Sequence, residues 1–88
     1  MHAEFPGANL TGANLAGAEL GNALLRFTTL TGANLTGADL HQADFIGANL
    51  AGAQLTGANA TGTNFEAAEI KNAVGLESVK GLDRTGSR

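Results

Sequence analysis

Residues 33–52 read ANLTGADLHQADFIGANLAG, which is a single five-residue pattern written four times. Each unit has alanine, then an amide or carboxylate, then a large apolar residue, then two more variable residues of which the last is most often glycine. The register continues in both directions, from Ala3 to Ala73, without an insertion. The middle position is apolar in all fourteen units from Phe5 to Ile70. Repetition this regular indicates a repeat architecture.

A period of five residues excludes a single helix or a straight strand. Five residues advance about 500° around an α-helix, so the leucines would spiral around it, and an odd step along a strand alternates faces. The chain must therefore turn once per unit, and glycine after the apolar residue suits such a corner because it tolerates positive φ. Stacked turns form a solenoid. The predicted interior residues are Phe5, Leu10, Leu15, Leu20, Leu25, Leu30, Leu35, Leu40, Phe45, Leu50, Leu55, Phe65 and Ile70, with the smaller Ala60 completing the series.

The phenylalanines indicate how many units close one coil. Phe5, Phe45 and Phe65 are separated by 40 and 20 residues, so they fall in one column if four units make a coil. This arrangement predicts four columns of inward side chains, with residues twenty apart lying on neighbouring coils.

Residues 8–12 (ANLTG), 33–37 (ANLTG) and 48–52 (ANLAG) resemble the A-(D/N)-L-X-X signature of the pentapeptide-repeat proteins, and the resemblance covers about 70 of the 88 residues. It implies an all-β fold, namely a right-handed quadrilateral β-helix of about 3.5 coils with one unit on each side. Such repeats are abundant in bacteria, especially cyanobacteria, so the resemblance also implies a bacterial protein.

The pattern changes near the C-terminus, which suggests how the chain is organised. We expect residues 1–74 to form the solenoid, residues 75–82 to form a short helical cap and residues 83–88 to form a flexible tail. Leu76, Val79 and Leu82 recur every third residue, as a helical turn laid over the last coil would require. Only Met1 and His2 precede the repeats, so the N-terminal coil looks uncapped. It either stacks on another molecule, giving a homo-oligomer, or frays.

Composition excludes several functions. There is no cysteine for a disulfide or a thiolate metal site, and the net charge of −3 argues against direct nucleic-acid binding. No apolar run approaches the roughly 20 residues of a membrane span, so we expect no membrane insertion. The N-terminus lacks the regions of a signal peptide, so a cytoplasmic location is the default expectation.

Residues with catalytic potential are few and scattered. His2 and His41 are the only histidines, Ser78 and Ser87 lie outside the repeats, and the acidic residues are distributed over different faces. We therefore predict a protein that is not an enzyme, with no catalytic, cofactor-binding or metal-binding residues.

Four outward positions depart from the polar rule and form a candidate interaction patch: Leu24, Arg26, Phe27 and Ile46. With a period of twenty, Arg26 lies beside Ile46, and Phe27 lies beside Gly47. Exposed apolar clusters of this kind often mark contacts. The alternative is drift of the repeat, with Phe27 folded over a corner to cover Gly47.

Three functional classes remain. The first, which the regular faces favour, is a structural or protein-interaction module whose partner the sequence does not name. The second is a DNA mimic that binds a type II topoisomerase such as gyrase, as some pentapeptide-repeat proteins do. The third is an ice-binding solenoid, although Thr11–Thr31 and Thr36–Thr56 are only short threonine pairs on different faces.

Overall fold

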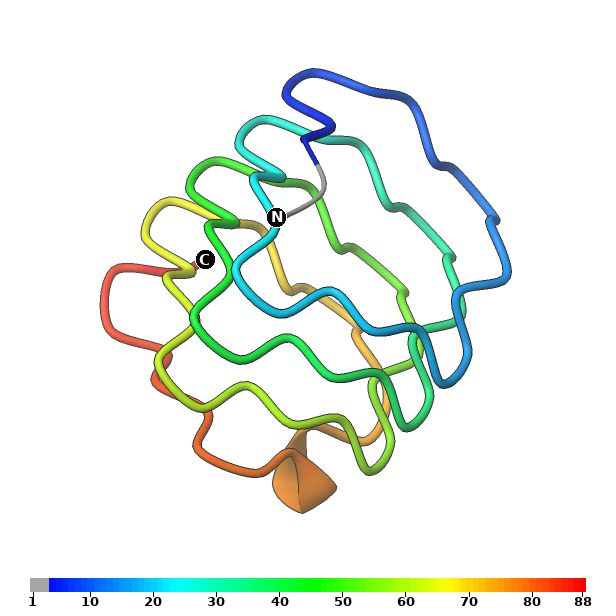
Figure 1. Ribbon diagram of the computed structural model, residues 1–88, viewed down its shortest axis with the longest axis vertical. Helices are drawn as coiled ribbons and strands as arrows, with labels where there is room; N and C mark the ends of the chain where they lie inside the picture. Colours follow the sequence, from blue (N-terminus) through cyan, green and yellow to red (C-terminus); the bar gives the residue numbers. More distant parts are fainter. Residues whose placement is uncertain (1–3) are drawn as a thin grey trace.

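The computed structural model describes residues 4–88, and this part of the chain forms a stack of coils. Figure 1 shows the coils following one another from the N-terminal end (blue) to the C-terminal end (red). The coils are joined by isolated parallel bridges, beginning with Glu4↔Leu24 and Asn9↔Thr29 and ending with Asn59↔Lys80. Within residues 4–88 the one helical element is the 3₁₀ helix η1 (Leu76–Ser78).

The spacing of the bridges confirms the coil of twenty residues. Eleven of the twelve bridges join residues that are twenty apart, and the last, Asn59↔Lys80, spans one residue more. Residues 4–23, 24–43 and 44–63 are therefore three successive coils, called coils 1, 2 and 3, and residues 64–74 begin a fourth. The predicted fold class is confirmed: the protein is a right-handed, four-sided β-helix of about three and a half coils.

Each corner is a four-residue turn that the repeat builds in the same way. In the first, the Ala8 N–H donates to the Phe5 carbonyl at 3.0 Å, and Gly7 has φ +71°. The third residue of this turn has a positive φ, which glycine adopts most easily, so glycine recurs there. Proline is favourable at the second position, where Pro6 lies. Five corners place a residue other than glycine in this conformation, and one of them is Phe27, with φ +60°.

The amide or carboxylate of the repeat closes the corner from outside. The Asn34 side-chain Oδ1 accepts a hydrogen bond from the Thr36 N–H at 3.1 Å, and Asp44 does the same for the Ile46 N–H at 3.0 Å. Asn and Asp are suited to this because their short side chains reach the backbone two residues on. The repeat therefore favours Asn or Asp for a local backbone reason, and most of these residues carry no implication of a binding site.

The interior is filled by the apolar columns. From Leu20 to Ile70 every central residue of the repeat is at most 8% exposed. In one column the rings of Phe45 and Phe65 stack at a centroid distance of 5.5 Å. The two buried threonines are satisfied, because Thr28 and Thr63 donate their hydroxyls to backbone carbonyls of the preceding coil. The core is therefore continuous along the stack.

The two ends differ. At the C-terminal end Leu76, Val79 and Leu82 pack against the core, and Ile70 is only 5% exposed. The segment expected to be a flexible tail is docked in the structure: the Ile70 N–H donates to the Arg88 carbonyl at 2.6 Å and the Arg88 N–H to the Ala68 carbonyl at 2.8 Å. At the N-terminal end Phe5 is 38% exposed, so the described residues leave the interior of coil 1 open. Met1 and His2, which precede the repeats, lie outside the described residues.

Candidate interaction surfaces

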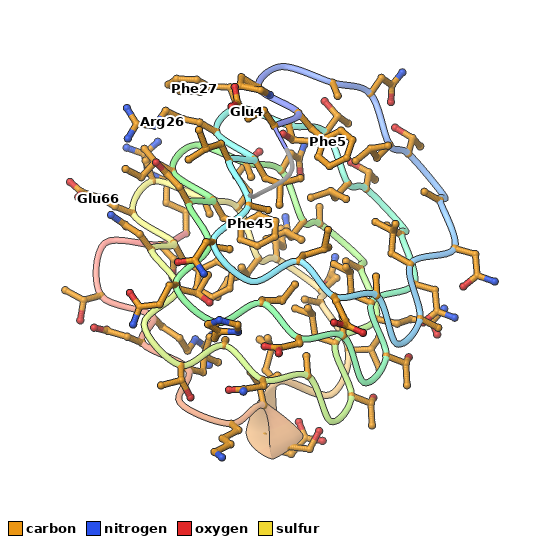
Figure 2. All side chains as sticks on the ribbon, in the orientation of Figure 1. Glu4, Phe5, Arg26, Phe27, Phe45 and Glu66 are labelled. Carbon is orange, nitrogen blue, oxygen red and sulfur yellow. The ribbon has the colours of Figure 1, made fainter. Side chains whose placement is uncertain are left out.

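The four residues of the candidate patch are brought together at one corner of the solenoid. Leu24 bridges Asp44 of the next coil, and the Phe27 N–H donates to the Ile46 carbonyl at 2.9 Å. Figure 2 shows Arg26 and Phe27 projecting from this edge of the molecule. We call Leu24, Arg26, Phe27, Asp44 and Ile46 the Phe27 patch.

Phe27 is the most exposed residue of the patch. Its ring lies over Gly47, so close that a Cβ built on Gly47 would come within 2.5 Å of ring carbons. A side chain at residue 47 would therefore displace the ring of Phe27 from this position. Phe27 nevertheless remains 65% exposed. Covering Gly47 thus accounts for the direction of the ring and leaves most of its surface facing solvent.

Arg26 is paired within the molecule, which sequence reasoning missed. Its Nε and Nη2 donate to Oδ2 of Asp44 at 3.0 and 2.6 Å. The Arg26 side chain is 51% exposed and that of Asp44 only 18%. The twenty-residue period contained the signal, because Asp44 is two positions before Ile46, the predicted neighbour of Arg26. The patch is therefore an apolar surface around a neutralised ion pair.

The environment of Asp44 lowers its pKa. Partial burial alone would raise the pKa of this carboxyl, but the side-chain hydrogen bond from Arg26, the backbone hydrogen bond from Ile46 and the positive charge of Arg26 outweigh it. The folded state therefore prefers the ionised carboxylate. This preference stabilises the fold above the unfolded pKa of about 4, and the stabilisation is lost as the pH falls through the lower folded pKa.

Replacing Arg26 with glutamine is expected to raise the pKa of Asp44 toward or above its ordinary value. Burial of the carboxyl remains, whereas the ionic partner is gone. The measurement is an NMR titration of the side-chain carboxyl carbon, with thermal unfolding recorded between pH 2 and pH 7. The variant should lose less stability than the parent below about pH 4. An unchanged titration midpoint would show that Arg26 does not hold the carboxylate in solution.

The N-terminal end is the second candidate surface. Leu10 and Leu15 are only partly buried there, whereas Leu30 and Leu35, their neighbours in the same columns of coil 2, are fully buried. This surface arises because a solenoid exposes its interior wherever no further coil covers it.

The third feature is an open depression at the C-terminal end. It has a volume of about 560 Å³ and lies between the Gly62–Glu66 side of the stack and the Gly81–Thr85 segment. Its carboxyl groups belong to Glu66 and Asp83, and the Asp83 Oδ1 already accepts a hydrogen bond from the Thr85 N–H. The depression therefore offers little beyond two acidic groups.

A further contact between titratable side chains joins His41 and Asp39, two residues apart in the sequence. The His41 Nδ1 lies 2.8 Å from the Asp39 Oδ1, and its ring covers Gly21. The hydrogen bonds from the His41 ring and backbone N–H hold the pKa of Asp39 below its ordinary value. Within residues 4–88 no three His, Cys, Asp or Glu residues lie close enough together to hold a metal ion. Over the same residues no helix has the length and apolarity needed to cross a membrane.

These features define a class of protein: a β-solenoid whose interior is filled and whose exposed apolar surfaces lie on its outer edge and at one end. The family model described as pentapeptide repeats matches residues 3–42 and 38–74, with eight copies of the repeat. The chain belongs to the pentapeptide-repeat family, as the resemblance of its sequence implied.

Solved structures give the same result. A pentapeptide repeat protein from the Arabidopsis thaliana thylakoid lumen is 28% identical over 97% of this chain, with a TM-score of 0.71. The pentapeptide repeat protein Rfr23 from the cyanobacterium Cyanothece 51142 is 36% identical over 90% of this chain, with a TM-score of 0.54. This chain spans 63% and 60% of the lengths of those two proteins. No curated protein sequence matched the chain.

Proposed function

We propose that this protein is a non-enzymatic interaction module that binds a protein partner through the Phe27 patch. The observation that carries the proposal is Phe27 itself, an aromatic side chain 65% exposed on a backbone with φ +60°. Aromatic residues, phenylalanine among them, are enriched in protein interfaces.

The backbone conformation at Phe27 argues against the view that this residue serves only to build the corner. A bulky residue with positive φ is a genuine outlier, and holding it there costs on the order of 1–2 kcal/mol. Gly7 and Gly47 occupy the same position in coils 1 and 3 with φ +71° and +68°. Glycine would therefore build this corner without strain, and the phenylalanine adds an exposed ring.

The ion pair suits the same role. Since Asp44 neutralises Arg26, the five residues of the patch carry no net charge. The acidic residues Glu4 and Glu66 flank the patch, beside Leu24 and Gly47 respectively. A partner can cover such a surface without burying an unpaired charge, which would be costly. We expect the partner to offer an apolar pocket that accepts the ring of Phe27.

Charge favours this function over DNA mimicry. Residues 4–73 carry six acidic residues and two basic ones, which gives 2 − 6 = −4, and Arg26 pairs with one of the acids. The outward rows consist mainly of amides and hydroxyls rather than carboxylates. A mimic of the phosphate backbone needs a dense row of negative charge, because one charge per about 1.7 Å of helix axis is the feature imitated.

The test compares the parent protein with Phe27→Gly as bait in a lysate of the source organism. The variant restores the residue that other corners have, so its thermal midpoint should equal or exceed that of the parent. We expect it to lose the partner that the parent retains, by at least tenfold in affinity once that partner is purified. Thr36→Ala, an exposed change on another side, is the matched control and should bind as the parent does. Equal capture by Phe27→Gly and the parent would contradict the proposal.

A further inference from the structure

The wall of coil 1 ends in unpaired backbone. In coil 2 the N–H groups of Asn34 and Asp39 donate to the Ala13 and Ala18 carbonyls of coil 1, both at 2.9 Å. In coil 1 the equivalent N–H groups belong to Asn14 and Glu19, and within residues 4–88 neither has a hydrogen-bond partner. The carbonyls of Asn9, Asn14 and Glu19 likewise accept no bond from this part of the chain. An open edge of this kind is a template for pairing with another chain.

Apolar surface accompanies the open edge. Phe5 is 38% exposed, and Leu10 and Leu15 are only partly buried. The opposite end is different, since the C-terminal cap leaves Phe65 only 3% exposed. Among residues 4–88 the two ends therefore offer unequal surfaces, and the interior is exposed at the N-terminal one.

We propose that the N-terminal coil is a self-association surface, on which a second copy of this chain docks head to head about a two-fold axis. A two-fold interface uses the same patch on both copies. Here both copies supply Leu10 and Leu15 together with the N–H donors of Asn14 and Glu19 and the carbonyl acceptors of residues 9, 14 and 19, so the surface can pair with its own copy. In the alternative arrangement the N-terminal face of one copy would dock on the C-terminal cap of the next. The exposed leucines would then contact an end whose apolar residues are already covered.

The area of the face sets the strength of the contact. The molecule measures 28 × 25 × 21 Å, so one end presents on the order of 500 Å² and two would bury about 1,000 Å² in total. Interfaces of that size lie at the weak, reversible end of specific association. Coil 1 also carries Glu19. This acid repels its counterpart across the two-fold axis, and salt screens that repulsion.

This inference is independent of the Phe27 patch. The ring of Phe27 leans over Gly47 of coil 3, away from coil 1, so its removal leaves the N-terminal face intact. Phe27→Gly should therefore lose the protein partner and keep the dimer, and a failure of either proposal can be told from a failure of the other.

The test is sedimentation equilibrium or light scattering of the 88-residue chain from micromolar to millimolar concentration, at low and high salt. We expect the mass to rise from 8.8 kDa toward twice that value and to stop there, at lower protein concentration in high salt. Leu15→Glu, which charges the face, should remain monomeric. Thr36→Glu, which adds the same charge to an exposed wall position of coil 2, should dimerise as the parent does.

A second variant keeps the test decisive if Leu15→Glu disturbs coil 1. Asn14→Pro and its control Asn14→Ala both lose the Oδ1 that accepts a hydrogen bond from the Ala16 N–H at 3.2 Å. Only Asn14→Pro also removes the backbone N–H, which has no partner within residues 4–88, so the edge of that variant can no longer donate there. Asn14→Pro too should stay monomeric, whereas Asn14→Ala should dimerise as the parent does. A parent chain that remains at 8.8 kDa at millimolar concentration would overturn the proposal. So would an open-ended series of larger masses, because head-to-tail stacking of one copy on the next predicts that result.

Discussion

Replacing Phe45 with alanine is expected to lower the free energy of unfolding by about 4 kcal/mol and the thermal midpoint by roughly 20 °C. Phe45 is fully buried and its ring stacks on Phe65 at 5.5 Å, so truncation removes a large side chain from the middle of the core. The void cannot be filled by a shift of one neighbour, because the coils on both sides are held by backbone hydrogen bonds such as that from the Phe45 N–H to the Asn64 carbonyl.

Phe45→Leu is the matched control for this prediction. The same column already accepts leucine at Leu25, which is 1% exposed, so the loss should be only about 1 kcal/mol. Urea unfolding followed by circular dichroism measures both variants. Equal losses for the leucine and alanine variants would mean that stacking on Phe65, rather than volume, dominates this column.

Leu35→Ala is expected to cost about 3 kcal/mol, several times the cost of Leu15→Ala. The two leucines share a column, but Leu35 is fully buried between coils 1 and 3, whereas Leu15 is only partly buried at the open end. In a solenoid each coil contacts only its neighbours, so a central position loses packing on two sides and a terminal position on one. Denaturant titration of the two variants in dilute solution, where the monomer prevails, gives the ratio.

The comparison of these two leucines also tests whether the N-terminal face is exposed in the monomer. If Leu15→Ala cost as much as Leu35→Ala in dilute solution, something would have to cover the N-terminal face even in the monomer. A loss for Leu15→Ala that appears only at high protein concentration would instead agree with the proposed self-association, because there the face is buried by a second copy.

Much of the fold could be predicted because the repeat is strict. A period of five residues excludes a helix or a straight strand, and the spacing of Phe5, Phe45 and Phe65 indicated a coil of twenty residues, which the bridges confirm. The handedness and the square cross-section came from the family resemblance, because the hydrophobic pattern is the same for either hand. The order of the C-terminal segment was not foreseen: residues 83–88 are polar, and their docking depends on backbone hydrogen bonds, which any sequence can make.

For the candidate surface, the sequence predicted which residues lie side by side but not which side chains form hydrogen bonds or ion pairs. The period placed Phe27 beside Gly47 and Arg26 beside Ile46, and the structure brings these residues together. The pairing of Arg26 with Asp44 was missed, since it runs diagonally between coils, over 18 residues rather than 20. Whether a long side chain turns toward its own column or the next one depends on rotamers, which a period does not encode.

By itself the sequence determined where the chain turns and which side chains face inward, because a five-residue alternation of alanine, leucine and glycine can bury its apolar residues only by coiling. Tertiary structure alone decided what the outside of the coil does: that the Phe27 ring covers one glycine and still faces solvent, that Asp44 neutralises Arg26, and that one end is covered while the other is open. The physical reason is that the period of the chain alone decides which side chains are buried. The contacts on the surface depend instead on which flexible side chains and free backbone edges meet across neighbouring coils.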